Sequence, residues 1–473
     1  MRSKLSRRNF LAGAAAAGIV PWPRPGQASS HAGLKEVFLK AKPGRVSLVG
    51  KPYPDTDVWS YNGIVPGPEI RVRQGSRLRV AVRNDLLEDT TVHWHGVRLP
   101  NAMDGVPHVT QPPIRPGDTF LYEFDCIDAG TFWYHPHLRG DAQVGRGLAG
   151  ALIVEEKEPP SVDRDVTWVL SDWRLGKDAS ITNDFGQMHD VAHAGRMGNT
   201  VTINGQVRES FVARAGERIR LRLINAANAR IFGLAFEGHA PQVIALDGQP
   251  VAPHAPEGGR VVLGPAMRAD LILDFGGKPG ERFRVTDNFY PRFEYRLLDI
   301  DYSAEPALPS RAPAEIRLAA NPLSEPDLQA AERHEVVLAG GMMGNLHSAL
   351  LDGRQTDLRT LVQNGLVWAI NGVAVKDHAH APMLTLQRNR SYVLDLINDT
   401  AWPHPMHLHG HAFRVVSRNG KPTALQEWRD TVLLAAREKA EIAFVADNPG
   451  DWMLHCHILE HQLGGMMSLL RVT

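Results

Sequence analysis

The feature that most constrains the fold of this 473-residue chain is a threefold repeat of one short pattern. In each copy an Asn-Gly pair precedes a segment in which apolar residues alternate with others and which ends at an asparagine: residues 78–84, 219–225 and 392–398. Alternation with period two is typical of a half-buried antiparallel strand that enters a turn. Many further short strands are expected between Gly/Pro turns, and no long run has a helical period. The sequence therefore predicts an all-β protein with three homologous β-sandwich domains.

Composition indicates where the three repeats meet. Residues 155–165 are charged and contain a Pro pair, and residues 302–326 contain five prolines. We expect domains at residues 31–156, 157–310 and 311–473.

The 52 basic residues balance 52 acidic residues, so we expect no nucleic-acid partner. Two cysteines cannot form a disulfide scaffold.

Residues 1–30 read as a secretory signal rather than as part of the fold. Basic residues come first, an apolar segment follows from Leu11 to Val20, and small residues and prolines complete it. Ten apolar residues are too few to span a bilayer. Residues 6–11, Ser-Arg-Arg-Asn-Phe-Leu, match the twin-arginine signal. We expect a periplasmic protein, exported by the twin-arginine machinery, with no stable membrane insertion.

Eleven of the 21 histidines fall in four short clusters, and eight of them form H-x-H pairs. Residues i and i+2 of a strand project from the same face, so each pair presents two imidazoles to one point. Imidazole suits Cu, Zn, Fe or Ni, and one ion cannot use eight. The sequence therefore predicts a cluster of several metal ions. Its expected ligands are His93, His95, His135, His137, His407, His409, His455 and His457.

The middle repeat has no ligands at the equivalent positions. Nine residues beyond the strand-ending asparagine, where the outer repeats have His93 and His407, it has Leu234. Five residues beyond a shared glycine, where they have His135 and His455, it has Val285. We therefore expect a site shared by the first and third domains, with no metal in the second.

Cys456 makes the predicted site more specific. If its two histidine neighbours face one side of a strand, the thiol faces the other side, where it can join His404 and His461. Two imidazoles, a thiolate and a weak thioether, here from Met466, are the ligands of a blue-copper electron-transfer site. Covalent bonds through Cys456 would connect that site to the cluster.

The motifs His-Trp-His-Gly, Tyr-His-Pro-His, His-Pro-Met-His-Leu-His-Gly-His and His-Cys-His-Ile-Leu-Glu-His-x4-Met resemble those of the multicopper oxidases. This family includes laccases, ascorbate oxidases, bilirubin oxidases and bacterial cuprous oxidases. The resemblance implies three cupredoxin-like Greek-key domains and four copper ions: one type 1, one type 2 and a type 3 pair. The implied type 1 ligands are His404, Cys456, His461 and Met466. The implied type 2 ligands are His93 and His407. The implied type 3 ligands are His95, His135, His137, His409, His455 and His457. His411 occupies a motif position that is not a ligand in the family.

The resemblance also implies the reaction. A donor would give single electrons to the type 1 copper, Cys456 would pass them on, and the cluster would reduce O2 to two waters. Asp104 resembles a carboxylate that lies near the type 2 copper in the family. The residue after His461 is often a glutamate in bacterial relatives but is Gln462 here. We therefore expect Glu460 or a chain of waters to deliver protons.

The donor is the least constrained part of this interpretation. Cuprous oxidases of the family carry a methionine-rich insert over the type 1 site, whereas the nearest feature here is residues 342–343, Met-Met. We therefore favour laccase-like oxidation of phenols or arylamines, with an edge of His461 or His404 open to the donor and Trp402 as a candidate contact. The alternatives are a periplasmic oxidase of Cu(I) or another metal ion in copper tolerance, and a passive copper-binding or scaffold protein. Four other histidines fit no motif and are expected on the surface or in loops: His189, His193, His378 and His380.

Overall fold

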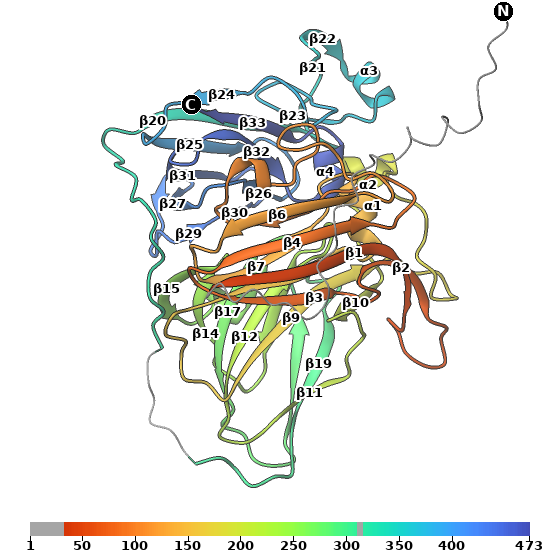
Figure 1. The fold of residues 1–473 in the computed structure, drawn as a ribbon, viewed down its shortest axis with the longest axis vertical. Helices are drawn as coiled ribbons and strands as arrows, with labels where there is room; N and C mark the ends of the chain where they lie inside the picture. The colour runs from red at the N-terminus through yellow and green to blue at the C-terminus, as the bar shows by residue number, and fades with distance from the viewer. Residues whose placement is uncertain (1–32, 310–315) are drawn as a thin grey trace, which may run out of the picture.

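The computed structural model describes residues 33–309 and 316–473. The expected export signal at residues 1–30 lies outside the described residues. Figure 1 shows a nearly all-β molecule: the third domain, in blue, lies at the top, the first, in red and orange, below it, and the second, in green, at the bottom. The predicted all-β fold with three cupredoxin-like sandwiches is confirmed. No helix within the described residues is long and apolar enough to cross a membrane.

The first domain contains two four-stranded sheets. One has the order β2 (Thr56–Tyr61), β1 (Leu34–Val46), β4 (Arg77–Asn84), β6 (Thr119–Asp125). The other has the order β3 (Gly67–Arg73), β8 (Gly150–Glu155), β7 (Gly130–His135), β5 (His93–His95).

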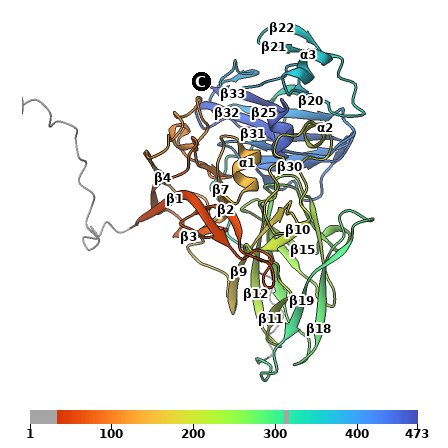
Figure 2. The same ribbon diagram turned by 90° about the vertical axis from the view of Figure 1, so that its right-hand side faces the viewer.

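The second domain contains a six-stranded and a five-stranded sheet, which Figure 2 shows projecting below the other two domains. The larger sheet has the order β10 (Thr200–Ile203), β9 (Arg164–Trp173), β12 (Arg218–Asn225), β17 (Arg268–Asp274), β14 (Gln242–Leu246), β15 (Gln249–His254). The smaller has the order β11 (Ser210–Ala213), β19 (Tyr295–Tyr302), β18 (Arg282–Asp287), β13 (Phe232–Phe236), β16 (Val261–Leu263).

The third domain contains a seven-stranded and a five-stranded sheet and a small hairpin. The larger sheet has the order β23 (Trp368–Ile370), β20 (Glu332–Gly340), β25 (Ser391–Asn398), β31 (Lys439–Val445), β27 (Phe413–Arg418), β28 (Lys421–Pro422), and β29 (Trp428–Arg429) also pairs with β27. The smaller has the order β24 (Leu384–Leu386), β33 (Met467–Val472), β32 (Gly450–Cys456), β26 (His404–Leu408), β30 (Thr431–Leu434). The hairpin joins β21 (Ser348–Leu351) to β22 (Arg354–Asp357).

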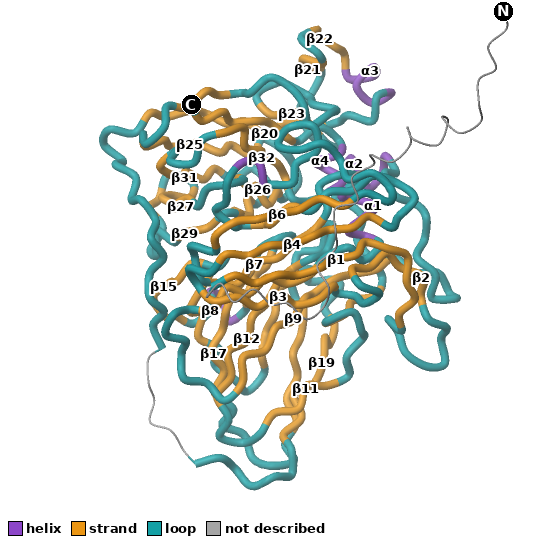
Figure 3. Tube along the Cα trace, in the orientation of Figure 1, coloured by secondary structure: helices purple, strands orange, loops and turns teal. Residues whose placement is uncertain are grey.

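The short helices in purple in Figure 3 lie outside the sheets. They are α1 (Gly140–Gly145), α2 (Met188–Ala192), α3 (Leu358–Gln363) and α4 (Leu459–Leu463), with 3-10 turns at Asn101–Met103 and Glu257–Gly259. Both α1 and α2 contact α4, so segments of all three domains meet at this point. Buried apolar residues of the first and third domains form one continuous cluster, whereas most of the second domain's core is separate.

The three strands that define the repeat are β4, β12 and β25, each beginning one residue before the predicted segment. Burial alternates along β4, as expected, but every residue of β12 is buried. The prediction of a half-buried strand is therefore wrong for β12. Its arginines are paired instead of solvated: Arg220 binds Glu156 and Asp270, and Arg222 binds Asp270 and Thr131 of the first domain. Buried arginines are tolerated when carboxylates pair with them.

Candidate metal centre

Two pairs of antiparallel strands present the clustered histidines. In the first domain β5 pairs with β7, so that His93 lies opposite His135. In the third domain β26 pairs with β32, so that His407 lies opposite His455. The histidines that are equally spaced in the two repeats therefore occupy equivalent positions in the paired strands of the two domains.

The eight paired histidines form three buried groups whose ring nitrogens lie within 4.8 Å of one another. The groups are His93, His95 and His407; His95, His135 and His457; and His137, His409 and His455. Three of the four H-x-H pairs divide between two groups, so their members do not meet at one point as expected, whereas His93 and His95 share the first group. Three adjacent groups indicate adjacent ions rather than one.

Unpartnered nitrogens test whether these residues fit metal ions. The Nε2 atoms of His93 and His407 and the Nδ1 atom of His95, which belong to one group, are buried without a hydrogen-bond partner among the described residues. Buried polar atoms are normally satisfied, so orphaned lone pairs that converge are what a metal site requires. Burial also lowers the pKa of His95 and His457, which keeps their imidazoles neutral and able to bind a cation. The chemistry of this set fits copper.

Two aspartates orient the rings around the first group. The backbone carbonyl of Asp104 accepts from His93 Nδ1 at 2.8 Å, and its carboxylate lies 2.8 Å from His409 Nδ1. The backbone carbonyl of Asp430 accepts from His407 Nδ1 at 2.8 Å, and its carboxylate lies 3.2 Å from His95 Nε2. Each aspartate therefore holds one histidine of the first domain and one of the third, and these bonds determine which ring nitrogen faces the site.

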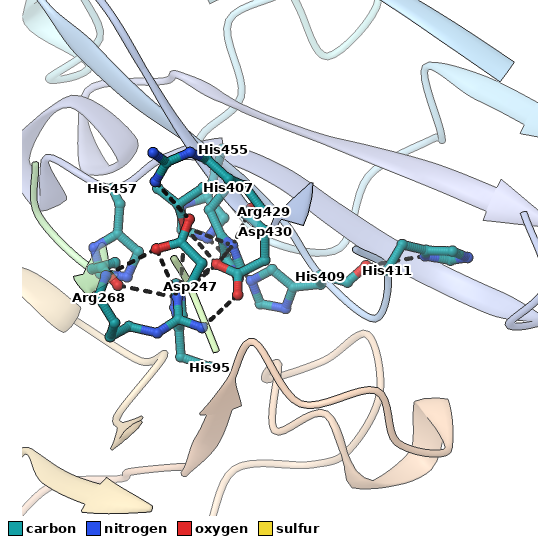
Figure 4. A network of polar contacts seen from close by, with 12 residues as sticks. His95, Asp247, Arg268, His407, His409, His411, Arg429, Asp430, His455 and His457 are labelled. Carbon is teal, nitrogen blue, oxygen red and sulfur yellow. Dashed lines mark hydrogen bonds and ion pairs between the residues drawn. The ribbon is translucent and has the colours of Figure 1, made fainter. Parts of the chain in front are cut away.

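The second domain contributes to this arrangement through Arg268 (Figure 4). Its guanidinium makes two bonds to Asp430, at 2.8 and 2.6 Å, and lies 3.6 Å from Asp247. Burial alone would raise the pKa of Asp430, but Arg268 and His407 hold it below its ordinary value. Asp430 is therefore a fixed anion beside the histidines.

Sequence reasoning placed Asp104 beside the site but missed Asp430 and Arg268. Asp104 lies eleven residues after His93, and the same spacing from His407 reaches Arg418. The hairpin of β27 and β28 adds residues between His407 and Asp430 in the third domain, so the spacing of the first domain is not kept there. A search for any aspartate between β26 and β30 would have found Asp430.

Cys456 faces away from its neighbouring histidines, as predicted. Its Sγ lies 3.4 Å from His404 Nδ1 and 3.6 Å from His461 Nδ1, and these two nitrogens are 3.0 Å apart. Met466 is fully buried beside this group, and its backbone bonds Cys456 and His461. Burial raises the pKa of the Cys456 thiol, and a bound cation would reverse this effect by favouring the thiolate.

The expectation of an open edge at this second site is wrong. The side chains of His404 and His461 are both 0% exposed. The Nε2 atom of His461 donates to the backbone carbonyl of His193 at 2.7 Å, and that of His404 bonds the Thr400 hydroxyl at 2.8 Å. The segment that follows α2 therefore covers the ring edge that a donor was expected to contact. A backbone carbonyl leaves no trace in the side-chain pattern, so the sequence could not show this cover.

Two of the histidines that fit no motif contact the expected ligands. His193 covers His461, and His378 lies with its Nε2 3.2 Å from His137 Nδ1. Both were expected on the surface or in loops. Both lie in loops, as predicted, and they are half-buried there. His189 is exposed as predicted.

Glu460 and Gln462 lie on α4. Glu460 is fully buried; its Oε1 accepts from Asn228 of the second domain at 3.1 Å, and its Oε2 has no partner among the described residues. Burial raises the pKa of Glu460 to about 7. Gln462 lines a cavity of about 50 Å³ that also touches His137 and His378. The structure shows no hydrogen bond between Glu460 and the histidine groups within the described residues.

The second domain has no comparable group of ligands in the described residues. Its strands β13 and β18 pair with Leu234 opposite Asp287, so Asp287 rather than Val285 is the structural equivalent of His135 and His455. The two-residue error arose from Gly280, which lies before β18, whereas Gly130 and Gly450 begin their strands.

Comparisons with known proteins agree with this geometry. Three family models described as multicopper oxidase match residues 42–159, 164–288 and 352–473. A multicopper oxidase structure from Pseudomonas thermotolerans has a TM-score of 0.81 and 35% identity, over 93% of this chain and 99% of that one. A multicopper oxidase from Campylobacter jejuni, described as a metallo-oxidase, has a TM-score of 0.77 and 28% identity, over 94% and 93%. A laccase from Neurospora crassa is 30% identical over 87% of this chain and 73% of its own length.

Cupredoxin-like domains that share a histidine cluster, with a cysteine joining it to a second site, define a copper-dependent oxidase. The chain belongs to the multicopper oxidase family, whose members are oxidoreductases that use O2 as electron acceptor.

Proposed function

We propose that this multicopper oxidase holds four copper ions and couples one-electron oxidation of a small reducing donor to four-electron reduction of O2 to water. The observation that carries the proposal is the set of buried groups: three adjacent groups of histidines and a fourth that contains Cys456. The type 1 ion would be held by His404, Cys456, His461 and Met466. The type 2 ion would be held by His93 and His407. The type 3 pair would be held by His95, His135, His137, His409, His455 and His457.

When bound, the copper ions accept electrons singly and supply four of them to O2. The chain's own residues connect and orient the sites. Cys456 is bonded through the backbone to His455 and His457, which gives electrons a short covalent route. Asp104 fixes the rings of His93 and His409. Glu460 is our candidate for handling protons, because it is buried near Cys456 and one of its oxygens has no partner among the described residues.

For the donor we propose laccase-like oxidation of phenols or arylamines at the surface formed by His193 and Trp402. The Trp402 ring lies 5.4 Å from the His193 ring, and the His193 carbonyl accepts the Nε2 proton of His461. An electron can tunnel across so short a bonded path, so the donor need not touch His461. The similarity to the Neurospora crassa laccase supports this reading.

Oxidation of Cu(I) or another metal ion is the second candidate. Met342 and Met343 are 52% and 66% exposed, and Met342 donates its backbone N–H to Ala192, next to His193. The structure thus brings the backbone of this methionine-containing segment next to the segment that covers His461. The Campylobacter jejuni metallo-oxidase gives this candidate further support.

The test is steady-state O2 uptake by copper-loaded protein with a phenol, an arylamine, Cu(I), Fe(II) and Mn(II) in parallel. Uptake with the organic donors and no added copper supports the laccase-like proposal. Dye oxidation only with excess copper, together with rapid Cu(I) oxidation, would favour the metal-ion oxidase. No uptake with any donor would contradict the proposal and leave a passive copper-binding or scaffold protein.

We also propose export to the periplasm by the twin-arginine machinery, on the motif at residues 6–11. Replacing Arg7 and Arg8 by lysine should retain the protein in the cytoplasm of a bacterial host. Recovery of the variant from the periplasm, with processing equal to that of the wild type, would contradict this route.

A further inference from the structure

One imidazole outside the four histidine motifs bonds directly to an expected copper ligand. The Nε2 atom of His378 lies 3.2 Å from Nδ1 of His137, and the two rings meet edge to face with centroids 5.2 Å apart. His378 comes from the third domain and His137 from the first. The bond therefore joins the two domains that share the cluster, through a side chain that is not itself an expected ligand.

The direction of this hydrogen bond follows from the position of His137. Its Nε2 atom faces the cluster, 3.4 Å from Nε2 of His455, so a bound copper ion would need the lone pair of that nitrogen. The proton of the His137 imidazole is then on Nδ1, which donates to Nε2 of His378. Burial lowers the pKa of His378 to about 4, so its ring is neutral and has a lone pair with which to accept.

The corresponding bonds of neighbouring ligands are made to oxygen. Nδ1 of His135 donates to the carbonyl of Pro136 at 2.9 Å, and Nδ1 of His455 donates to that of Cys456 at 3.0 Å. A carbonyl oxygen can only accept, so it holds each ring in one tautomer. At His137 an imidazole of the third domain takes the place of such an oxygen. A substitution can remove this imidazole, whereas it cannot remove a backbone carbonyl.

The loop that carries His378 is anchored on a strand of the cluster. Val375 is buried in one apolar group with Met453 of β32, and β32 also carries His455. The acceptor of the His137 proton is therefore fixed relative to the ligand that lies opposite His137.

We propose that His378 is a positioning residue for His137: it accepts the Nδ1 proton and thereby fixes the tautomer and the orientation in which His137 binds copper. This inference rests on the proposed oxidase function, because it requires copper at the histidine groups. A partner of this kind raises the basicity of a ligand, and its removal typically lowers metal affinity about 10–100-fold. In this role His378 touches neither copper nor O2.

The test needs a substitution that removes the acceptor and keeps water out. A cavity of about 50 Å³ touches both rings, and this volume can hold a water molecule. His378→Ala would extend the cavity and let water accept from His137. His378→Phe keeps the volume of the ring without a lone pair, whereas His378→Gln keeps an acceptor oxygen near the position of Nε2. His380→Phe is the control in the same loop, because Nδ1 of His380 donates to the Asp377 carbonyl at 3.1 Å and not to a ligand.

Copper-loaded proteins are titrated with a copper chelator, and metal analysis counts the copper that remains while blue absorption reports the Cys456 site. His378→Phe should lose copper from the histidine groups at a chelator concentration about tenfold or more below that for the wild type. It should keep its blue absorption, because the Cys456 site does not include His137. His378→Gln and His380→Phe should lose copper close to the wild-type concentration.

Two results would overturn the proposal. One is equal resistance of His378→Phe and the wild type to the chelator. The other is equal copper loss in His378→Phe, His378→Gln and His380→Phe, which would assign the effect to the loop and not to the hydrogen bond. If His378→Phe failed to fold, His378→Leu, which also lacks an acceptor, would take its place with the same expected outcomes. Wild-type protein without copper at the histidine groups would instead contradict the proposed function.

Discussion

Gly96, which follows the first H-x-H pair, tests how tightly the second domain is packed against the cluster. Its φ is +82°, and a Cβ built there would lie 2.4 Å from both Arg268 Nη2 and Asp430 Oδ2. A methyl group cannot fit at that distance, so Gly96→Ala must displace the buried ion pair. The glycine of His-Trp-His-Gly is thus explained by a contact with two other domains.

The expected magnitude has two parts that can be separated. A left-handed backbone costs a residue with a Cβ roughly 1–2 kcal/mol. Breaking a buried ion pair costs roughly 3–5 kcal/mol, because it leaves an uncompensated charge. Gly117→Ala is the control for the first part: φ is +84° and nothing lies within 4 Å of the added Cβ. Gly96→Ala should therefore be about 3–5 kcal/mol more destabilising than Gly117→Ala.

The assay is urea unfolding of the copper-free proteins, followed by metal analysis after copper loading. Gly117→Ala should keep its full copper content, whereas Gly96→Ala should lose copper from the cluster, because Asp430 no longer orients His95 and His407. Equal destabilisation by the two substitutions, with equal copper content, would refute the close packing of Arg268 and Asp430 against Gly96.

Four further substitutions or measurements test the assigned roles. Cys456→Ser should abolish the intense blue absorption and nearly all oxidase activity while the histidine groups still bind copper; a blue variant would contradict the type 1 assignment. Met466→Leu should remain blue with a higher reduction potential, because the axial thioether is a weak ligand that tunes the potential; an unchanged potential in redox titration would assign the axial position to another residue. Metal analysis of loaded protein should find four coppers, and copper bound between residues 164 and 288 in a structure would contradict the ligand-free second domain. Asp430→Asn should destabilise the protein by roughly 3–5 kcal/mol, because Arg268 keeps a buried charge without its main partner; unfolding at the wild-type urea concentration would contradict this.

The parts of the molecule that follow from local pattern could be predicted from the sequence. Period-two alternation located β4, β12 and β25, because a strand exposes alternate residues to different surroundings. The same rule separated Cys456 from its neighbours, and the structure brings it to His404 and His461. These inferences need only the geometry of one strand.

Contacts between distant segments could not be predicted in this way. Asp430 and Arg268 are 162 residues apart, and neither lies in a motif. The covering of His461 depends on a main-chain oxygen, which any residue in place of His193 could supply. Spacing also failed where the domains differ in length, as at Gly280 and Asp430.

The position of the second domain explains why a repeat without ligands matters to an oxidase. Through Arg268 it holds Asp430 ionised beside the histidine groups, and through the segment after α2 it covers His461. One contact acts on the site where O2 is expected to be reduced, and the other on the site where electrons are expected to enter. Most of the second domain's buried apolar residues are separate from those of the other two domains. Its sequence can therefore change at one of these two contacts without disturbing the other. We therefore expect donor preference to depend on the second domain's residues around α2 more than on the copper ligands themselves.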